Sequence, residues 1–425
     1  MKRRITFCAA ALLAAFSANG QDPIIDSWML NTTGVATYDV GSGVVTMSDS
    51  ADVTRVCYDA NNVYVVAEGL ANYQMGQFPS NPNTPAGQDF VWRFTRNAQA
   101  ETGTHTAQPS SGALGAAVNG VALYGISDTR SYQASSGQNT PMGDGIWNQD
   151  AWISEGNTMD ANGNGHPQQQ GEYHYHANPI SLYSDPSTSH SPIIGFAFDG
   201  YPIYGPFGYD DPLDSMSQIV RIETSYALRN ITDRTTLPDG SPSTPPGPTL
   251  ASYALGQYQE DYEYIASSGH LDEYNGRFCY TPDYPNGTYA YFISTESNGD
   301  PKFPYMIGME YYGQVSVMDI NTGSNATIPG SATNCITPQN VSVVDMEEVD
   351  FDIYPNPANE QVLIELDNDT YTIEIVDVTG KVISSTQSNG NTTISTVNYA
   401  NGLYFVKVSS IDGTATSTTK LMVSH

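Results

Sequence analysis

The chain has 425 residues, enough for two or three domains, and carries 45 Asp and Glu against 15 Lys and Arg, a net charge of −30. Such a polyanion is not suited to bind nucleic acid or an anionic membrane surface, because both interactions depend on clustered Lys and Arg. With 39% hydrophobic residues, 29 tyrosines and 38 glycines, the composition predicts a folded, loop-rich β protein that acidic side chains keep soluble.

The first residues are typical of a secretory signal peptide. Basic residues at positions 2–4 are followed by an apolar run from Ile5 to Phe16 and by a small-residue cleavage pattern. The run is shorter than the roughly 20 residues of a membrane-spanning helix. We therefore expect residues 1–20 to be removed and the mature chain to begin at Gln21. We also expect the mature chain to contain no transmembrane segment.

The central part of the chain alternates short strand patterns with turns. Val63–Ala67 and Phe90–Thr95 are predicted strands, and Ala116–Tyr124 is a further strand broken by Asn119-Gly120. Helical periodicity appears over Ala254–Ile265. These patterns predict a mainly β fold.

Three cysteines remain after the expected cleavage: Cys57, Cys279 and Cys335. Export favours disulfides, and three cysteines allow one intramolecular bridge with one thiol left over. Cys57 and Cys279 both flank strand-like segments, whereas Cys335 lies in a linker-like stretch. We expect Cys57 to pair with Cys279, although sequence alone leaves the pairing open.

Four of the seven histidines, His166, His174, His176 and His190, lie within about a tenth of the chain. If residues 173–176 form a strand, alternation places His174 and His176 on one face and two tyrosines on the other. Two imidazoles so spaced can share a metal ion, with His166 folding back as a hairpin neighbour and His190 adding a further donor. Imidazole suits Zn or Cu. The alternative is a polar strand whose histidines form hydrogen bonds in a tyrosine-rich core.

A related pattern recurs later in the chain. Residues 171–176 read GEYHYH and residues 287–292 read GTYAYF, so the second copy keeps the glycine and both tyrosines and replaces both histidines. If the two strands are related, the tyrosines are structural and the histidines functional. Chance similarity in a tyrosine-rich chain is the alternative.

Several acidic residues near the histidines have two interpretations. Asp199, on a turn after an apolar run, could orient a ligand histidine from behind, act as a general base, or satisfy backbone amides. Residues 160–165 match the first half of a calcium loop, but Gly171 stands where its closing acid is expected. We therefore favour a plain turn there and rank Ca²⁺ below Zn or Cu. Asp272 and Glu273 are predicted to be surface acids.

No nucleophile elbow, phosphate loop, dinucleotide fingerprint or His-Glu-x-x-His motif occurs in the sequence. Whether the protein is an enzyme therefore stays open. Two functions remain: a metal-binding exported protein, or a non-enzymatic carbohydrate-binding or adhesion module. In the second, exposed tyrosines would contact sugar rings and the histidines would be structural.

Seven motifs follow one another in fixed order between Asp52 and Val317. They are Ala117–Val121, Gly165–Pro167, Gly171–His176, His190–Pro206, Leu271–Arg277, Tyr280–Tyr289 and Phe303–Tyr305. The set resembles the YHYH family, whose members look like exported or surface proteins. The resemblance defines a YHYH-like domain over residues 21–321 more firmly than it defines an activity.

The end of the chain is a separate unit after a linker over residues 322–350. Short alternating strands are predicted at 362–366, 371–376, 381–384, 403–408 and 418–423, a spacing typical of a small β-sandwich. The motifs at 351–358, 378–382, 401–408 and 420–423 make residues 351–425 similar to the type A C-terminal sorting domain of type IX secretion. That similarity implies the type IX machinery as partner. It also implies passage through an outer membrane, removal of the domain, and surface attachment or release.

Overall fold

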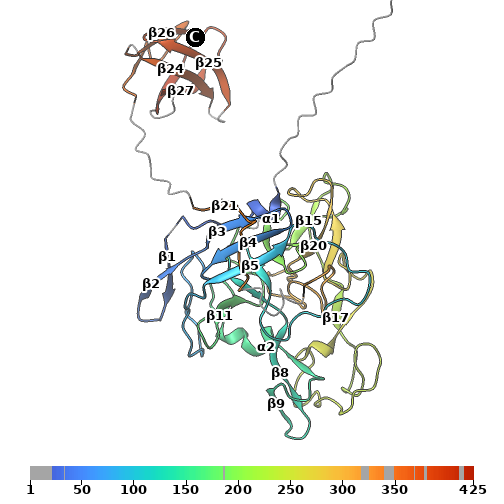
Figure 1. The fold of residues 1–425 in the computed structure, drawn as a ribbon. Coiled ribbons are helices and arrows are strands. Elements are labelled where there is room, and N and C mark those ends of the chain that lie inside the picture. The colour runs from blue at the N-terminus through green and yellow to red at the C-terminus, as the bar shows by residue number, and fades with distance from the viewer. Residues whose placement is uncertain are drawn as a thin grey trace, which may run out of the picture. The chain divides into compact units, whose positions relative to one another are not determined.

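The computed structural model of the protein describes residues 22–32, 34–184, 187–316, 325–338, 349–367, 369–377, 381–410 and 416–425. The expected signal peptide, residues 1–20, lies outside them, as do residues 378–380 of one sorting-domain motif. The chain forms two compact units, Met1–Pro338 and Gln339–His425 (Figure 1). Both are mainly β, as the sequence predicts. The helices of the described chain are too short to cross a lipid bilayer.

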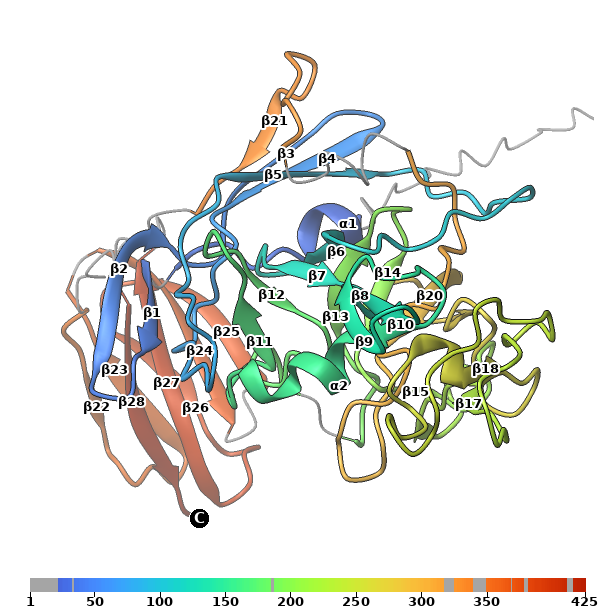
Figure 2. The same ribbon diagram turned by 90° about the horizontal axis from the view of Figure 1, so that it is seen from below.

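An eight-stranded mixed sheet lies at the centre of the first unit (Figure 2). Its four central strands are almost entirely buried, so their sequences are largely continuous apolar runs and not alternating ones. Its order is β11 (Gly165–Pro167), β12 (Tyr173–Tyr175), β7 (Ala122–Tyr124), β6 (Ala113–Ala117), β13 (Ile193–Ala197), β14 (Pro202–Tyr204), β20 (Thr288–Phe292) and β19 (Gly276–Cys279).

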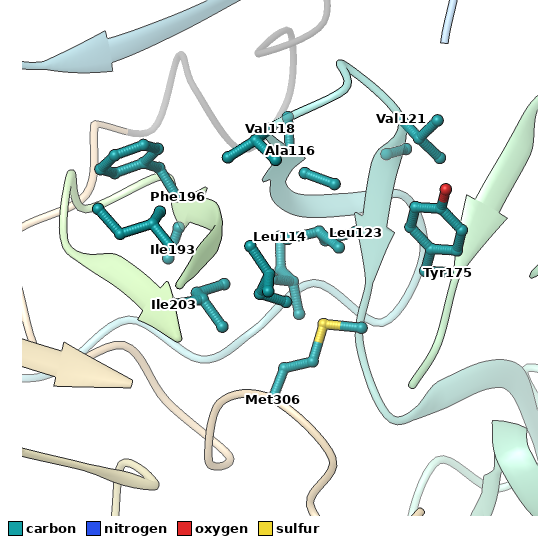
Figure 3. Packing of buried hydrophobic residues seen from close by; sticks show 14 of the residues in the cluster. Leu114, Ala116, Val118, Val121, Leu123, Tyr175, Ile193, Phe196, Ile203 and Met306 are labelled. Carbon is teal, nitrogen blue, oxygen red and sulfur yellow. The ribbon is translucent and has the colours of Figure 1, made fainter. Parts of the chain in front are cut away.

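Two hairpins, β6–β7 and β13–β14, meet at the middle of this sheet. The predicted strand over residues 116–124 is the β6–β7 hairpin, and Asn119-Gly120 forms its turn as predicted, with Gly120 at φ +81°. Figure 3 shows apolar side chains of both hairpins gathered in one cluster, among them Leu114, Leu123 and Ile203. Burying each side chain of this kind contributes about 1.5–3 kcal/mol, so the cluster fixes the hairpins against one another.

The sheet consists of two halves with the same topology. In the first half (β6, β7, β11, β12), β7 pairs in parallel with β12, which pairs antiparallel with β11. In the second half (β13, β14, β19, β20), β14 pairs in parallel with β20, which pairs antiparallel with β19.

The registers of the two halves correspond. Tyr175 lies opposite Leu123, and Tyr291 lies opposite Ile203. At the junction of the two halves, Gly115 pairs with Ala197 and Ala117 pairs with Gly195. These pairs are symmetric about the central pair of Ala116 and Phe196, so an approximate two-fold axis at that pair relates the two halves. The repeated sequence pattern therefore occupies equivalent strands, β12 and β20.

A four-stranded sheet packs on the central one and carries the disulfide. Its order is β21 (Asn334–Ile336), β3 (Val53–Tyr58), β4 (Asn62–Ala67) and β5 (Phe90–Thr95), and the indole N–H of Trp92 donates to the carbonyl of Gly120 at 2.9 Å. Cys335 lies directly opposite Cys57 and forms the disulfide with it, while Cys279 is a buried free thiol. The predicted pairing of Cys57 with Cys279 is wrong, because Cys279 belongs to an edge strand of the other sheet.

Part of the segment predicted as a linker belongs to the first unit. β21 falls inside residues 322–350, and the first unit extends to Pro338. The backbone of the bridge-forming residue Asn325 also pairs with Val91 of β5. Polar, Gly- and Pro-containing composition indicated a linker, but an edge strand can have the same composition when backbone pairing supplies its stability.

Smaller elements surround these two sheets. The helix predicted over residues 254–265 is wrong. One 3₁₀ turn, η2 (Gln259–Asp261), and the strand β18 (Tyr262–Tyr264) occupy that segment, because both carboxylate oxygens of Asp261 bind the buried Arg234. The remaining elements of this unit are α1 (Pro23–Asp26), β1 (Val35–Asp39), β2 (Val44–Ser50), β8 (Ser127–Gln133), β9 (Gln138–Pro141), β10 (Asn148–Asp150), α2 (Ala151–Glu155), η1 (Gly156–Thr158), β15 (Phe207–Tyr209), β16 (Ile219–Arg221) and β17 (Tyr226–Leu228).

The second unit contains two sheets around one apolar core, as the sequence predicts. The predicted strands correspond to β23 (Gln361–Glu365), β24 (Thr370–Asp377), β25 (Val382–Asn389), β27 (Gly402–Ser410) and β28 (Thr416–Val423). Two short strands were not predicted, β22 (Asp352–Tyr354) and β26 (Thr392–Ser395). Alternate residues such as Ile373, Ile375, Val406 and Val408 are completely buried.

Candidate metal centre

The β11–β12 hairpin brings three histidines together at the edge of the central sheet. His166 on β11 lies directly opposite His174 on β12, and His176 follows two residues later. The turn between the strands ends at Gly171, whose φ of +83° falls in the left-handed region that favours glycine. The hairpin neighbour expected from the sequence is therefore present.

Alternation along β12 separates histidines from tyrosines, as predicted. The hydroxyl groups of Tyr173 and Tyr175 lie 3.1 and 2.8 Å from the hydroxyl of Tyr73 on the far side of the strand. Asn119 donates to Tyr175 at 3.1 Å, and Tyr173 donates to Asp160 at 2.5 Å. The tyrosines thus anchor one face of β12 and leave the other to the imidazoles.

The three imidazoles converge on one point. Each offers a ligand nitrogen, and these nitrogens all lie within 4.8 Å of one another. The Nε2 atoms of His174 and His176 are 3.1 Å apart. The three residues are only 6%, 2% and 2% exposed, so water competes little for these nitrogens.

Hydrogen-bond partners assign the tautomer of each ring. The Nδ1 atoms of His174 and His176 face the carbonyl oxygens of Glu172 and Gly125 at 3.1 and 2.8 Å, and a carbonyl only accepts. The Nδ1 of His166 lies 2.8 Å from the hydroxyl of Thr158, whose own proton goes to a backbone carbonyl. All three Nδ1 atoms therefore donate, and in the neutral rings the three Nε2 atoms are lone pairs.

Converging imidazole nitrogens of this kind can coordinate a cation. The Nε2 of His166 has no hydrogen-bond partner although it is buried. Burial, and then the neighbouring charges of His176 and His166, hold the pKa of His174 well below its usual value, so this ring resists protonation.

Glu155, the last residue of α2, adds an oxygen to the cluster. Its Oε2 lies 3.4 Å from the Nε2 atoms of both His166 and His176. Ligands about 2 Å from a tetrahedral metal ion are about 3.4 Å apart, so these two spacings suit an oxygen beside the cluster, although the group whose ligand atoms all lie within 4.8 Å of one another consists of the three histidines. Burial raises the pKa of Glu155, but the two nearby histidines outweigh burial and lower the pKa, which leaves a carboxylate at neutral pH.

Sequence reasoning missed Glu155. It lies eleven residues before His166 and is placed by the start of α2, where the Asp150 side chain accepts from the backbone of Ile153. No local motif links such a residue to a His-x-His strand, so only the fold reveals it.

A second layer of contacts holds the imidazoles in place. The ring of Tyr124 stacks on His174 with centroids 4.0 Å apart, and its hydroxyl donates to Glu172 at 2.9 Å. The amide of Gln168 donates to both Tyr124 and Glu172 at 2.9 Å. Such outer contacts fix ring orientation and are typical of metal ligands.

A small polar cavity of about 150 Å³ adjoins the centre. Glu155 and the three histidines line it together with Ser127, Asp128 and Thr129. An ion held by the three histidines would therefore have room beside it for a fourth ligand, either the Glu155 carboxylate or a water molecule.

The structure does not bring His190 into the cluster. Among the described residues, the group of convergent ligands comprises only the three histidines above. His190 lies in the second half of the sheet, with its ring centroid 5.0 Å from Tyr204 and 6.0 Å from Phe292. Its nearness in sequence misled the prediction, because β13 leads the chain into the other half.

Asp199 does not lie behind a ligand histidine. The hydrogen bonds described for its carboxylate come from the Tyr291 hydroxyl at 2.5 Å and from the amides of Gly313 and Tyr201 at 2.9 and 3.2 Å. Burial raises its pKa to about 6, although these hydrogen bonds act in the opposite direction. The turn interpretation fits this placement, and the assignment to the metal site does not.

Two other acidic residues have structural partners. The carboxylate of Asp160 accepts from the amides of Asn162 and Gly163 and from Tyr173, which fits the turn interpretation of residues 160–165. Asp272 is not a surface acid as predicted, because it accepts from the buried Tyr289 at 2.8 Å. Both acids anchor the tyrosine that begins the repeated pattern.

Many tyrosines lie inside the protein and not on its surface. Tyr173, Tyr175, Tyr204, Tyr258, Tyr291 and Tyr311 are completely buried. The abundance of tyrosine therefore reflects the core and gives little support to the exposed-tyrosine interpretation.

Comparison with known proteins gives two family matches. The model of a family described as YHYH protein matches residues 91–303, half of the chain, and that of the secretion system C-terminal sorting domain matches residues 352–424. No curated protein matches the chain.

One similar solved structure comes from a study of PorZ, described as an essential bacterial surface component of the type-IX secretion system of Porphyromonas gingivalis. The match has 10% identity and a TM-score of 0.16, and it covers 88% of this chain and 51% of that one. The chain thus spans about half the length of that protein, and a similarity this low carries no argument.

Proposed function

The chain belongs to the YHYH protein family and ends in a secretion system C-terminal sorting domain, and from that premise we propose that it is an exported transition-metal-binding protein. His166, His174 and His176 would supply three nitrogen donors and Glu155 one oxygen. The observation that carries the proposal is the convergence of three buried Nε2 lone pairs, two of them 3.1 Å apart.

The donor set favours zinc or copper. Imidazole nitrogen suits both ions, and three histidines with one further ligand form a common tetrahedral zinc arrangement. A bound ion of this kind acts as a Lewis acid and lowers the pKa of coordinated water. Calcium prefers six to eight oxygen ligands, so it fits this centre poorly.

The residues of the chain itself would prepare the site. The carbonyls of Glu172 and Gly125 and the Thr158 hydroxyl hold the Nδ1 protons, which directs the Nε2 lone pairs inward. The carboxylate of Glu155 offsets the charge of the ion, and the cavity admits a small ligand.

The sorting domain directs the protein out of the cell, to the surface or the medium. We further propose that its partner is the type IX secretion machinery. An amino-terminal signal peptide over residues 1–20 would provide the first step of export. Surface attachment or release of the first unit, which extends to Pro338, would follow removal of the sorting domain.

Metal analysis of the purified full chain tests the central claim. We expect one equivalent of zinc or copper in the wild type after loading and dialysis, and none in His174→Ala/His176→Ala. His190→Ala is the matched control, since it removes a largely buried histidine outside the cluster and should retain the metal. A wild type that holds no metal, or a double variant that holds as much as the wild type, would refute the proposal.

A further inference from the structure

A second and larger cleft lies on another side of α2. Its volume is about 620 Å³, against about 150 Å³ for the cavity at the metal centre. Volumes of this size are typical of sites for organic ligands. None of the four metal donors lines the cleft, so any ligand it takes is not a ligand of the metal.

The cleft has an apolar floor that includes a tryptophan. Trp152 and Met159 line it, and Trp152 is half-buried. The other three tryptophans, Trp28, Trp92 and Trp147, are 6%, 0% and 2% exposed and belong to the core. A tryptophan left partly open beside a cleft provides a flat apolar surface for a ligand.

The rest of the lining is rich in side-chain amides. Gln74 and Gln77 are exposed and Asn162 is half-buried. The Asn162 amide already donates to the carbonyl of Gln74 at 2.8 Å and the Gln77 amide to Asp39 at 3.1 Å, so their side-chain oxygens and the Gln74 amide are the groups offered to a ligand. Hydroxyl groups on a ligand can donate to these oxygens and accept from the Gln74 amide.

The charges at the cleft are negative. Asp39 and Asp160 are the ionisable groups among the described lining residues, and no Lys, Arg or His is among them. Asp160 is already engaged by two backbone amides and by Tyr173. An anionic ligand would find no counter-charge there, so a neutral ligand fits better.

From these features we propose that the cleft binds a neutral saccharide. The open part of the half-buried Trp152 ring suits the C–H face of a pyranose ring, and the side-chain amides of Gln74, Gln77 and Asn162 suit its hydroxyl groups. The volume has room for more than one ring. The site is independent of the proposed metal centre, although both are built partly on α2.

Calorimetric titration of the full chain with defined oligosaccharides tests this proposal. The neutral probes are cellohexaose, xylohexaose, laminarihexaose and chitohexaose, and hexagalacturonate is the anionic probe. We expect at least one neutral probe to bind and the anionic probe not to bind. Trp152→Ala should weaken binding by about tenfold or more, and Gln77→Ala should weaken it by a smaller factor.

Controls separate the cleft from the rest of the surface and from the metal centre. Phe278→Ala removes another aromatic side chain, 55% exposed, that does not line the cleft, and it should leave the affinity unchanged. His174→Ala/His176→Ala should still bind the saccharide, so failure of the metal proposal would not affect this one. Tryptophan fluorescence should shift on binding in the wild type and not in Trp152→Phe.

Three results would overturn the proposal. They are the absence of binding to all four neutral probes, equal affinity of the wild type and Trp152→Ala, and tighter binding of the anionic probe. Circular dichroism shows whether each variant is folded. If Trp152→Ala is unfolded, Gln77→Ala provides the test.

Discussion

The two halves of the central sheet share a topology but not a chemistry. Where the first half has His166 and His174, the registers place Arg277 and Ala290 in the second, and Phe292 stands in the place of His176. The tyrosines remain: Tyr173 and Tyr289 each donate to an aspartate, Asp160 and Asp272. The comparison separates residues that the fold requires from residues that only the first half uses.

The hairpin turns show the same division. In the first half Asn119 donates to the Tyr175 hydroxyl at 3.1 Å, whereas in the second half the Tyr291 hydroxyl donates to Asp199 at 2.5 Å. The side-chain amide of Asn119 in the first half therefore corresponds to the carboxylate of Asp199 in the second, because each forms a hydrogen bond with the second tyrosine of the repeated pattern. The contact is structural in both halves. Asp199 is therefore buried as the partner of Tyr291 and does not belong to the histidine cluster.

Copying the second half into the first should have the largest effect. His174→Ala/His176→Phe installs residues that the equivalent strand already accommodates, so the variant should fold. Saturating Zn²⁺ should stabilise the wild type by about 4 kcal/mol at a thousand times its Kd and should not stabilise the variant. Chemical denaturation with and without Zn²⁺ measures this. Equal stabilisation of both proteins would contradict the assignment of the ligands.

Asp199→Asn should abolish a pH dependence that belongs to the second half. Because the pKa of Asp199 in the folded state is about 6, against an ordinary value of 3.8, the folded state holds the proton more tightly. This carboxyl therefore weakens folding progressively as pH rises from about 4 to about 6, by up to about 3 kcal/mol above that range. Denaturation at pH 4 and pH 7 should show this change in the wild type and not in the variant.

The asparagine variant also has a cost that does not depend on pH. Its single side-chain oxygen cannot replace both carboxylate oxygens of Asp199, which accept from the amides of Gly313 and Tyr201. The difference between the two pH values, and not the stability at either one, is therefore the decisive quantity. A variant with the pH dependence of the wild type would show that Asp199 is not the titrating group.

Glu155→Gln should weaken metal binding less than loss of the histidines does. The amide keeps the shape of the side chain and loses the charge, so we expect a decrease in affinity of about 10- to 100-fold. Asp128→Asn is the matched control, because it neutralises an acid that lines the same cavity without joining the donors. Competition titration with a chelator measures both, and equal losses would remove Glu155 from the donor set.

The smallest expected effect is a difference in the free energy of unfolding between two variants, each of which lacks one buried tyrosine hydroxyl. Tyr291→Phe removes one of the three donors to the buried carboxylate of Asp199, whereas Tyr175→Phe removes hydrogen bonds to neutral partners only. Hydrogen bonds to charged groups contribute more than neutral ones, so Tyr291→Phe should cost about 1 kcal/mol more in the free energy of unfolding at neutral pH. Denaturant titration of the two variants checks this, and the opposite order would invalidate the equivalence.

Much of the site could be predicted because its signals are local. Alternation along β12 placed His174 and His176 on one face, and a short turn made His166 a plausible neighbour. Glu155 could not be predicted, since its position depends on how α2 packs against the sheet. His190 and Asp199 were assigned by nearness in sequence, but the chain enters the other half of the sheet before reaching either residue.

The fold was predicted in parts for the same reason. Turn residues in the sequence mark the β6–β7 hairpin and the ends of the strands in the second unit. The disulfide partner of Cys57 was not predictable, because β21 joins β3 from 278 residues away, and its polar composition resembles a linker.

The position of that disulfide has a consequence for a chain that is cut during export. Cleavage just after Pro338, at the boundary of the two units, would leave a new carboxyl terminus three residues beyond Cys335. The covalent bond to Cys57 would hold this new end against β3, so fraying could not spread into the sheet. A carboxypeptidase outside the cell would therefore find a short carboxyl-terminal segment held by the disulfide, and not a long unpaired tail.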